Sequence, residues 1–129
     1  MAADAARPPF PPATFDHVLI DAPCSGLGTL RRRADARWRI MPKDVQELAV
    51  LQQRIIDASA PLVKPGGTLV YSVCTLLSVE SVDHSVPAEF VPITDEPEGE
   101  WRPFGTGWRV LPHDADTDGM VLLRWRKSA

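Results

Sequence analysis

The sequence has none of the features that mark a membrane-spanning, secreted or disulfide-stabilised protein. Its 129 residues contain no apolar run close to the roughly 20 residues that cross a bilayer. The opening segment, MAADAARPPFPP, lacks the hydrophobic stretch of a secretory signal. Cysteine is scarce, and the only two, Cys24 and Cys74, lie 50 residues apart in unlike surroundings, which is no disulfide framework. We therefore expect one domain with a modest core, in the reducing cytoplasm.

The sequence also lacks an excess of positive charge, but its charges are unevenly distributed. The formal net charge is −3, which argues against a generally basic nucleic-acid binder. Residues 31–39, RRRADARWR, nevertheless carry five arginines against one acid, whereas residues 83–100 carry six acids and no lysine or arginine. The basic segment predicts a contact with an anionic partner. Two solvated surface loops are the alternative interpretation of the same charges.

Two apolar runs predict buried strands. Residues 15–20 (FDHVLI) and 68–73 (TLVYSV) are apolar at their centres rather than alternating, which is typical of parallel strands covered on both faces. Between them, residues 42–62 have apolar side chains three and four positions apart, which predicts an amphipathic helix that residues 64–67 (KPGG) terminate. The predicted apolar face of this helix comprises Val45, Leu48, Leu51, Ile55, Ala58 and Leu62.

Smaller elements are predicted in the C-terminal part. A short helix over residues 78–85 and a short strand over 90–93 precede two strands at 108–111 and 120–125, whose turn-rich linker favours a hairpin. Strand, helix, strand and hairpin in this order form half of a doubly wound α/β sheet. Because this half leaves an unprotected sheet edge, we expect the first strands of a larger sheet to be missing, or to be supplied by a partner chain or dimer.

Each cysteine follows the carboxyl end of one predicted parallel strand, where open α/β sheets bind ligands. Cys24 stands three residues beyond Asp21, and Cys74 directly follows Val73. If the strands are neighbours, both thiols and the Asp21 carboxyl group share one crevice. Two other interpretations remain. The cysteines can be small buried side chains, the commonest fate of a free cysteine, or zinc ligands, although the histidines lack the spacing of a metal site.

The residues around the cysteines resemble the motifs of a known family. Residues 21–38, DAPCSGLGTLRRRADARW, are similar to motif IV of the Sun/Fmu family of RNA cytosine-5 methyltransferases. Residues 63–67 (VKPGG) are similar to another signature of that family, and residues 71–75 (YSVCT) resemble its motif VI. Residues 111–120 resemble the closing hairpin of the family. The four motifs stand in the family's order, and the resemblance covers the chain from Asp4 to Arg126.

The resemblance implies methylation of cytosine C5 in RNA, foremost ribosomal RNA, through a covalent cysteine adduct. Cytosine C5 is a poor nucleophile until a thiolate has added to C6. By resemblance, Cys74 is that nucleophile, and Cys24 assists removal of the C5 proton and release of the product. Asp21 faces the N3/N4 edge of the cytosine, the cofactor, or both, and a carboxyl group at N3 would stabilise the adduct. No metal is implied.

The implied cofactor is S-adenosylmethionine, and the chain has only part of the site for it. By resemblance, Asp21 and Pro23 contact the cofactor, and Asp4, at the end of a third strand, contacts its adenine. The glycine-rich motif I and the acid that binds the ribose have no counterpart. The fold class implied is α/β: residues 1–129 form a partial S-adenosylmethionine-dependent methyltransferase domain, the C-terminal half of a Rossmann-like class I methyltransferase sheet. We therefore expect the isolated chain to lack turnover.

The basic segment continues the motif IV loop, so its arginines are expected to hold RNA phosphates beside a flipped cytidine. These residues are Arg31, Arg32, Arg33 and Arg37. Trp38 can stack on a base or cap the core, and the core is favoured.

A non-catalytic RNA-binding remnant of such an enzyme is the main alternative. Two further methyltransferase classes fit less well. A DNA cytosine-5 enzyme would carry its nucleophile in the Pro-Cys loop, followed by glutamine. An amino-group methyltransferase would show Asp/Asn-Pro-Pro-aromatic in place of residues 21–24 (DAPC).

Overall fold

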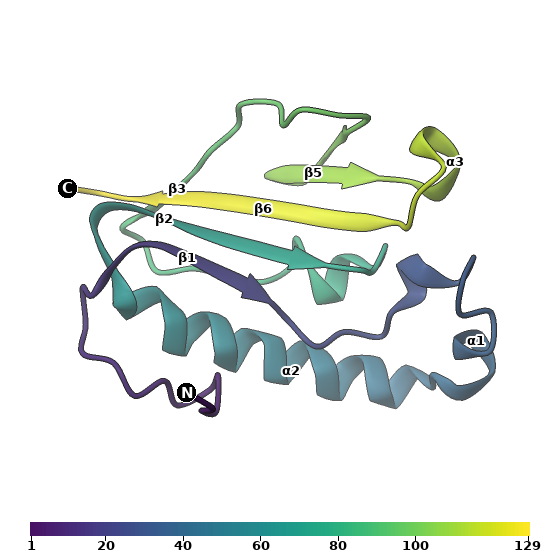
Figure 1. Cartoon of the computed structure of the whole chain (residues 1–129), viewed down its shortest axis with the longest axis horizontal. Helices are drawn as coiled ribbons and strands as arrows, with labels where there is room; N and C mark the ends of the chain where they lie inside the picture. The colour runs from purple at the N-terminus through teal and green to yellow at the C-terminus, as the bar shows by residue number, and fades with distance from the viewer.

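The computed structural model describes all residues, 1–129, as one twisted sheet with a long helix against one face (Figure 1). β1 and β2 pair in parallel, and all other neighbouring strands pair antiparallel, which confirms the predicted parallel pair followed by an antiparallel hairpin. The strands lie in the order β1 (Phe15–Asp21), β2 (Val63–Val73), β6 (Met120–Lys127), β5 (Gly107–Val110) and β4 (Arg102–Phe104), while β3 (Phe90–Pro92) pairs with the end of β6.

The helices are one long element and several single turns. None of them is long and apolar enough to cross a membrane. The α-helices are α1 (Ala36–Arg39), α2 (Pro42–Ser59) and α3 (Pro112–Ala115), and the 3-10 turns are η1 (Leu27–Thr29), η2 (Ala60–Leu62) and η3 (Ser78–Glu80).

The helix α2 begins and ends where its sequence dictates. Pro42 occupies the first turn, where its missing N–H costs nothing, and the Asp44 carboxylate accepts the backbone N–H of Met41 at 2.8 Å. Pro61 lacks the N–H that an α-helix would need, and the helix tightens there into η2.

The buried face of α2 differs from the predicted one. Leu48, Leu51 and Ala58 are only half-buried, whereas Gln52 is fully buried and contacts the loop after β1 and η3. The apolar pattern missed this residue because a glutamine counts as polar in the sequence. In the structure its amide is hydrogen-bonded inside the protein, so the buried face of the helix includes a polar contact.

The sheet is covered on one face only, which corrects the expectation of strands buried on both faces. Ile20, Leu69 and Tyr71 point into the core beneath α2. Leu19, which directly precedes Ile20 and points to the other face of β1, is 68% exposed. An apolar strand centre indicates that both faces of the strand can be buried. It does not show that residues of the same chain bury both faces.

The C-terminal half follows the predictions with three changes. β5 and β6 form the expected antiparallel pair, but their linker contains the short helix α3. The helix predicted over residues 78–85 is reduced to the single turn η3. β4, at the outer edge of the sheet, lies in a segment for which the sequence predicts no helix or strand. These elements are short, and pairing with neighbouring strands decides their conformation.

Candidate active site

The two cysteine-bearing loops meet at the carboxyl ends of β1 and β2. Asp21 is paired with Ser72, so the loops that follow these residues start side by side. The N–H of Gly28 donates to the carbonyl of Cys74 at 3.0 Å, and the Cys24 thiol lies against the backbone of Cys74. Asp21 is close enough to Cys74 for its charge to act on the thiol. The structure thus brings both cysteines and Asp21 together, with both thiols free and only partly buried.

A fully buried carboxylate joins the two loops. Oε1 of Glu80 accepts the backbone N–H of Ser25 at 2.8 Å and the side-chain amide of Gln52 at 3.2 Å. Oε2 accepts the hydroxyls of Ser25, at 2.6 Å, and Thr75, at 2.7 Å. Ser25 and Thr75 each directly follow one of the two cysteines. Every partner donates to the carboxylate, which offsets the cost of burying it and ties the loops together.

Gln52 connects this carboxylate to α2. Its amide nitrogen also donates to the carbonyl of Pro23 at 2.9 Å, and its oxygen accepts Nε2 of His84 at 2.9 Å. The hydroxyl of Tyr71 donates to the backbone carbonyl of Glu80 at 2.8 Å. Burial lowers the pKa of His84 and raises the pKa of Tyr71, so both side chains are neutral at pH 7. The network therefore surrounds its carboxylate with neutral groups.

Gly28 lets three segments approach one another closely. A Cβ atom there would lie 2.1 Å from the carbonyl oxygen of Gly119 and 2.9 Å from the carbonyl carbon of Cys74. The N–H of Gly119 donates back to the carbonyl of Gly28 at 2.7 Å. The glycine of motif IV thus packs directly against motif VI and against the turn that precedes β6. Only a residue without a side chain fits this position.

The structure separates the arginines of the basic segment into two kinds. Arg33 and Arg37 have no carboxylate partner. The guanidinium of Arg37 lies instead 5.0 Å from the ring centroid of Trp38. Trp38 is 78% exposed, so the expectation that it caps the core is wrong. The other three arginines form ion pairs: Arg31 with Asp116, Arg32 with Asp118, and Arg39 with Asp35.

Two of the three predicted cofactor contacts, Asp21 and Pro23, lie at a second place, beside the edge strand β1. A cavity of about 220 Å³ is lined by Asp21, Pro23 and Ala5, among other residues. Asp4, the neighbour of Ala5, is exposed, and its carboxylate accepts the N–H of Ala6 at 2.9 Å within a turn. Asp21 is thus the residue that belongs to both places.

Both thiols are held in the protonated state by their surroundings. Burial raises the pKa of Cys24, and the charge of Glu80 adds to this effect. Burial also raises the pKa of Cys74, followed by the charges of Asp21 and Asp118, while Arg32 lowers it. Since the thiolate is the reactive form of a cysteine, positive charge brought near Cys74 would increase its reactivity at neutral pH.

Asp118 is one of the two carboxylates whose charge raises the pKa of Cys74. Asp118→Asn removes a negative charge that raises the pKa of the thiol, and it releases Arg32, which lowers that pKa. A lower pKa means more thiolate at pH 7.5, so we expect Cys74 to react about two- to tenfold faster with iodoacetamide. The rate–pH profile, followed by mass spectrometry of the Cys74 peptide, should shift to lower pH.

Asp116→Asn is the matched control for this experiment. Asp116 lies in the same linker as Asp118 and pairs with Arg31, but neither Asp116 nor Arg31 contributes to the pKa of Cys74. Its profile should equal that of the parent chain. A slower reaction of Cys74 in the Asp118 variant would contradict the assignment.

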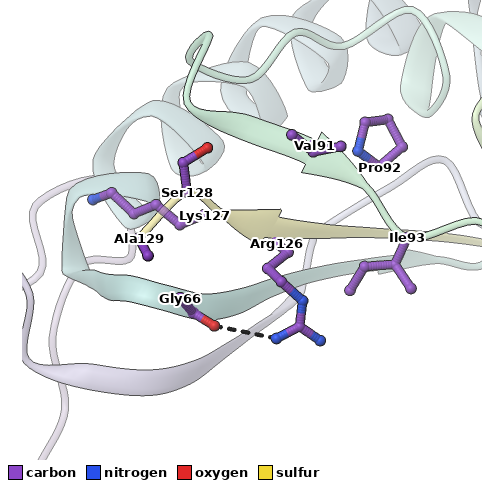
Figure 2. Close-up of a pocket in the computed structure, with 8 residues that line it drawn as sticks. All are labelled: Gly66, Val91, Pro92, Ile93, Arg126, Lys127, Ser128 and Ala129. Atoms are coloured by element: carbon purple, nitrogen blue, oxygen red, sulfur yellow. Dashed lines mark hydrogen bonds between the residues drawn. The ribbon is translucent and has the colours of Figure 1, made fainter.

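A larger pocket at the opposite end of the sheet has no part in this site. Figure 2 shows it around the ends of β3 and β6, with a volume of about 340 Å³. Arg126 donates to the carbonyl of Gly66 at 3.2 Å, and Lys127 donates to the carbonyl of Val63 at 3.0 Å. No cysteine or carboxylate side chain lines it. The loops after β1 and β2 remain the place where reactive groups converge.

Comparison with known proteins identifies the family. A family model described as 16S rRNA methyltransferase RsmB/F matches residues 1–124. The chain belongs to this family. The resemblance seen in the motifs is thereby confirmed, and with it the methyltransferase sheet.

Relatives of this RsmB/F family member are much longer proteins. It is 41% identical to the ribosomal RNA small subunit methyltransferase B of Yersinia pestis, over 85% of this chain and 26% of the relative. It is also 41% identical to a Bacillus subtilis protein named probable ribosomal RNA small subunit methyltransferase B, over 88% of this chain and 28% of the relative. The chain thus spans about a quarter of the length of these relatives.

Solved structures show the same fold for this part of the family. The NSun6 protein of Pyrococcus horikoshii, solved with SFG, an analogue of S-adenosylmethionine, superposes with a TM-score of 0.73 at 27% identity. The match covers 86% of this chain and 29% of NSun6. A methyltransferase homologue from the same organism superposes with a TM-score of 0.68 at 26% identity, over 89% of this chain and 40% of the homologue.

Sequence reasoning missed Gln52, Asp116 and Asp118 as parts of this site. A glutamine in the middle of an apolar helix face signals a buried hydrogen-bonding partner, and this signal was present for Gln52. The two aspartates stand in a turn-rich linker far along the chain from the arginines they pair with. No local pattern predicts such pairs.

Proposed function

We propose that this chain is the catalytic C-terminal part of an RNA cytosine-5 methyltransferase that acts on small-subunit ribosomal RNA. The proposal rests on one observation: Cys24, Cys74 and Asp21 converge after two neighbouring parallel strands, in loops that a buried carboxylate ties together. The names of the relatives support ribosomal RNA as substrate.

Cys74 acts as the nucleophile in this proposal. Its thiolate forms a C–S bond to cytosine C6, and the electron pair of the C5–C6 double bond moves to C5. S-adenosylmethionine, when bound, supplies the methyl group that C5 takes up. Removal of the C5 proton then restores the double bond, and the C–S bond breaks with return of its electron pair to the Cys74 sulfur.

Cys24 and Asp21 assist from the other loop. Cys24 lies against the backbone of Cys74, where the thiolate form of Cys24 can accept the C5 proton. Asp21 stands at the end of β1, where a carboxyl group facing cytosine N3 would stabilise charge that develops on the ring. Arg32 is the cation of this chain that lowers the pKa of the nucleophile.

The residues present fit one end of S-adenosylmethionine. The cavity beside β1 combines apolar side chains, Leu19 and Ile20, with the carboxylate of Asp21, which suits an adenine ring and its amino group. No glycine-rich loop in this chain can hold the methionine end. We therefore expect calorimetric titration of the isolated chain with S-adenosylmethionine to show no binding at micromolar ligand and no turnover.

A chimera tests the reaction itself. In it, residues 1–129 replace the matching segment of the Bacillus subtilis relative, and the unmodified relative is the positive control. We expect the chimera to convert cytidine to 5-methylcytidine in unmethylated small-subunit ribosomal RNA, measured by mass spectrometry of nucleosides. A folded chimera that binds RNA but yields no 5-methylcytidine would favour a non-catalytic RNA-binding remnant.

A further inference from the structure

An open apolar groove lies next to the two cysteine loops and has no role in the reaction described above. Its volume is about 420 Å³, within the range of small-molecule sites. Leu27 and Leu77 form part of its wall, and each stands three residues beyond one of the cysteines. The start of α2 provides most of the rest, through Met41, Pro42 and Val45. The groove is therefore built from both motif loops and the main helix.

The groove continues into an exposed aromatic side chain. Arg37 lines the groove and also stacks on Trp38. Because Trp38 is 78% exposed with Arg37 over one face of its indole, the other face is open to solvent. Met41, at the groove, is also 59% exposed. The guanidinium of Arg37 and the thioether of Met41 thus line the groove, and the exposed indole of Trp38 lies beside Arg37.

We propose that this groove and Trp38 bind unpaired bases of the RNA that flank the target cytidine. Aromatic side chains and arginine planes stack on nucleobases of any sequence, and they require those bases to be unpaired. The inference rests on the proposed RNA substrate and names the part of the RNA that this surface contacts.

The charges around the groove favour an anionic occupant. Arg33 and Arg37 have no carboxylate partner, so their charges are available to phosphates. The one acid of the basic segment, Asp35, is paired with Arg39 at 3.4 Å. Asp44, at the start of α2, is engaged with the backbone of Met41. An apolar peptide would stack on the groove equally well but would leave both free arginines without partners.

Binding of a fluorescein-labelled single-stranded RNA to the full chain tests the inference by fluorescence anisotropy. Trp38→Ala should weaken binding about 5- to 150-fold, the effect of losing one stacked base, and Trp38→Phe should restore most of it. Arg37→Gln should weaken binding and reduce its salt dependence. A duplex of the same sequence should bind more weakly and should be insensitive to Trp38→Ala.

Arg54→Gln is the matched control for charge. Arg54 is exposed on α2 beyond the groove, and its loss removes the same charge without touching the groove or Trp38. Because Trp38 is exposed, its replacement should leave the urea unfolding curve unchanged. Equal affinity of the parent chain and the Trp38→Ala variant for single-stranded RNA would overturn the inference.

The chimera separates failure of this inference from failure of the proposed function. There, Trp38→Ala should raise KM for RNA at least about fivefold with little change in kcat. Methylation by the Trp38→Ala chimera with an unchanged KM would overturn the inference that the groove binds RNA bases and would leave the proposed function intact. Conversely, Trp38-dependent RNA binding by a chimera that forms no 5-methylcytidine would support the groove and remove the proposed reaction.

Discussion

Cys74→Ala should abolish methyl transfer by the chimera, a loss of about a thousandfold or more in kcat. Without the sulfur, nothing adds to C6, so C5 does not gain the electron density that methylation needs. The side chain is only partly buried and lies outside the core cluster, so the variant should unfold at the same urea concentration as the parent. Nucleoside mass spectrometry and single-turnover kinetics measure the loss.

Cys24→Ala should instead make the covalent complex between RNA and Cys74 accumulate. If Cys24 assists departure of the product, its loss leaves the RNA attached to Cys74, and a covalent complex should persist in a denaturing gel with ordinary cytidine RNA. The double variant should show no complex, because the bond depends on Cys74. A Cys74→Ala chimera that still forms 5-methylcytidine, or a complex that survives in the double variant, would refute the assignment of the nucleophile.

Glu80→Leu should cost about 3–5 kcal/mol in the free energy of unfolding, measured with urea on the isolated chain. Leucine fills the space of the side chain but leaves the Ser25 N–H and one of the two N–H groups of the Gln52 amide buried without an acceptor. The loops after β1 and β2 also lose their common anchor. The rates at which the two cysteines react with iodoacetamide should then become more similar, because the loops that give the two thiols different surroundings are no longer held in place.

Glu80→Gln is the informative comparison. Its carbonyl oxygen can replace Oε1, and the hydroxyls of Ser25 and Thr75 can rotate to accept the new amide hydrogens, so we expect a cost of about 1–2 kcal/mol. The variant removes the charge that raises the pKa of Cys24, so this thiol should react at lower pH while the loops stay in place. Equal stability of the leucine variant and the parent would mean that the carboxylate does not hold the loops.

Tyr71→Phe is a control for the same network. It removes one hydrogen bond, to the backbone carbonyl of Glu80, and leaves the carboxylate contacts intact. The expected loss is about 1 kcal/mol, with no change in thiol reactivity. A loss as large as that of the leucine variant would indicate that the whole buried cluster, rather than the carboxylate, determines stability.

The family motifs and the strand pattern were sufficient to predict that Asp21 and both cysteines meet at one edge of the sheet. Apolar centres at residues 18–20 and 69–71 predict two strands, and each cysteine follows one of them. The parallel pairing of β1 with β2 then places the cysteines at the same edge of the sheet. This part of the site is encoded locally, because side chains that follow a strand keep their position relative to its end.

Contacts between segments distant in sequence could not be predicted in this way. The exposure of Trp38 shows the limit: an aromatic residue in a short helical turn has the same sequence pattern whether it packs inward or points to solvent. The same holds for the ion pairs of Arg31 and Arg32 with the turn before β6. Which charges remain free for a ligand depends on these pairs, and therefore on the folded chain.

The sequence by itself determined the half-sheet, the position of both cysteines and the family. These features depend on hydrophobic periodicity and on short contiguous motifs, which act over a few residues. Only the tertiary structure decided that Glu80 and Gln52 connect the cysteine loops and that Gly28 admits Cys74 and Gly119. It also decided that Arg37 borders an open groove and contacts the exposed Trp38. Hydrogen bonds, close backbone contacts and exposure arise from packing of distant segments, and packing is a property of the whole chain.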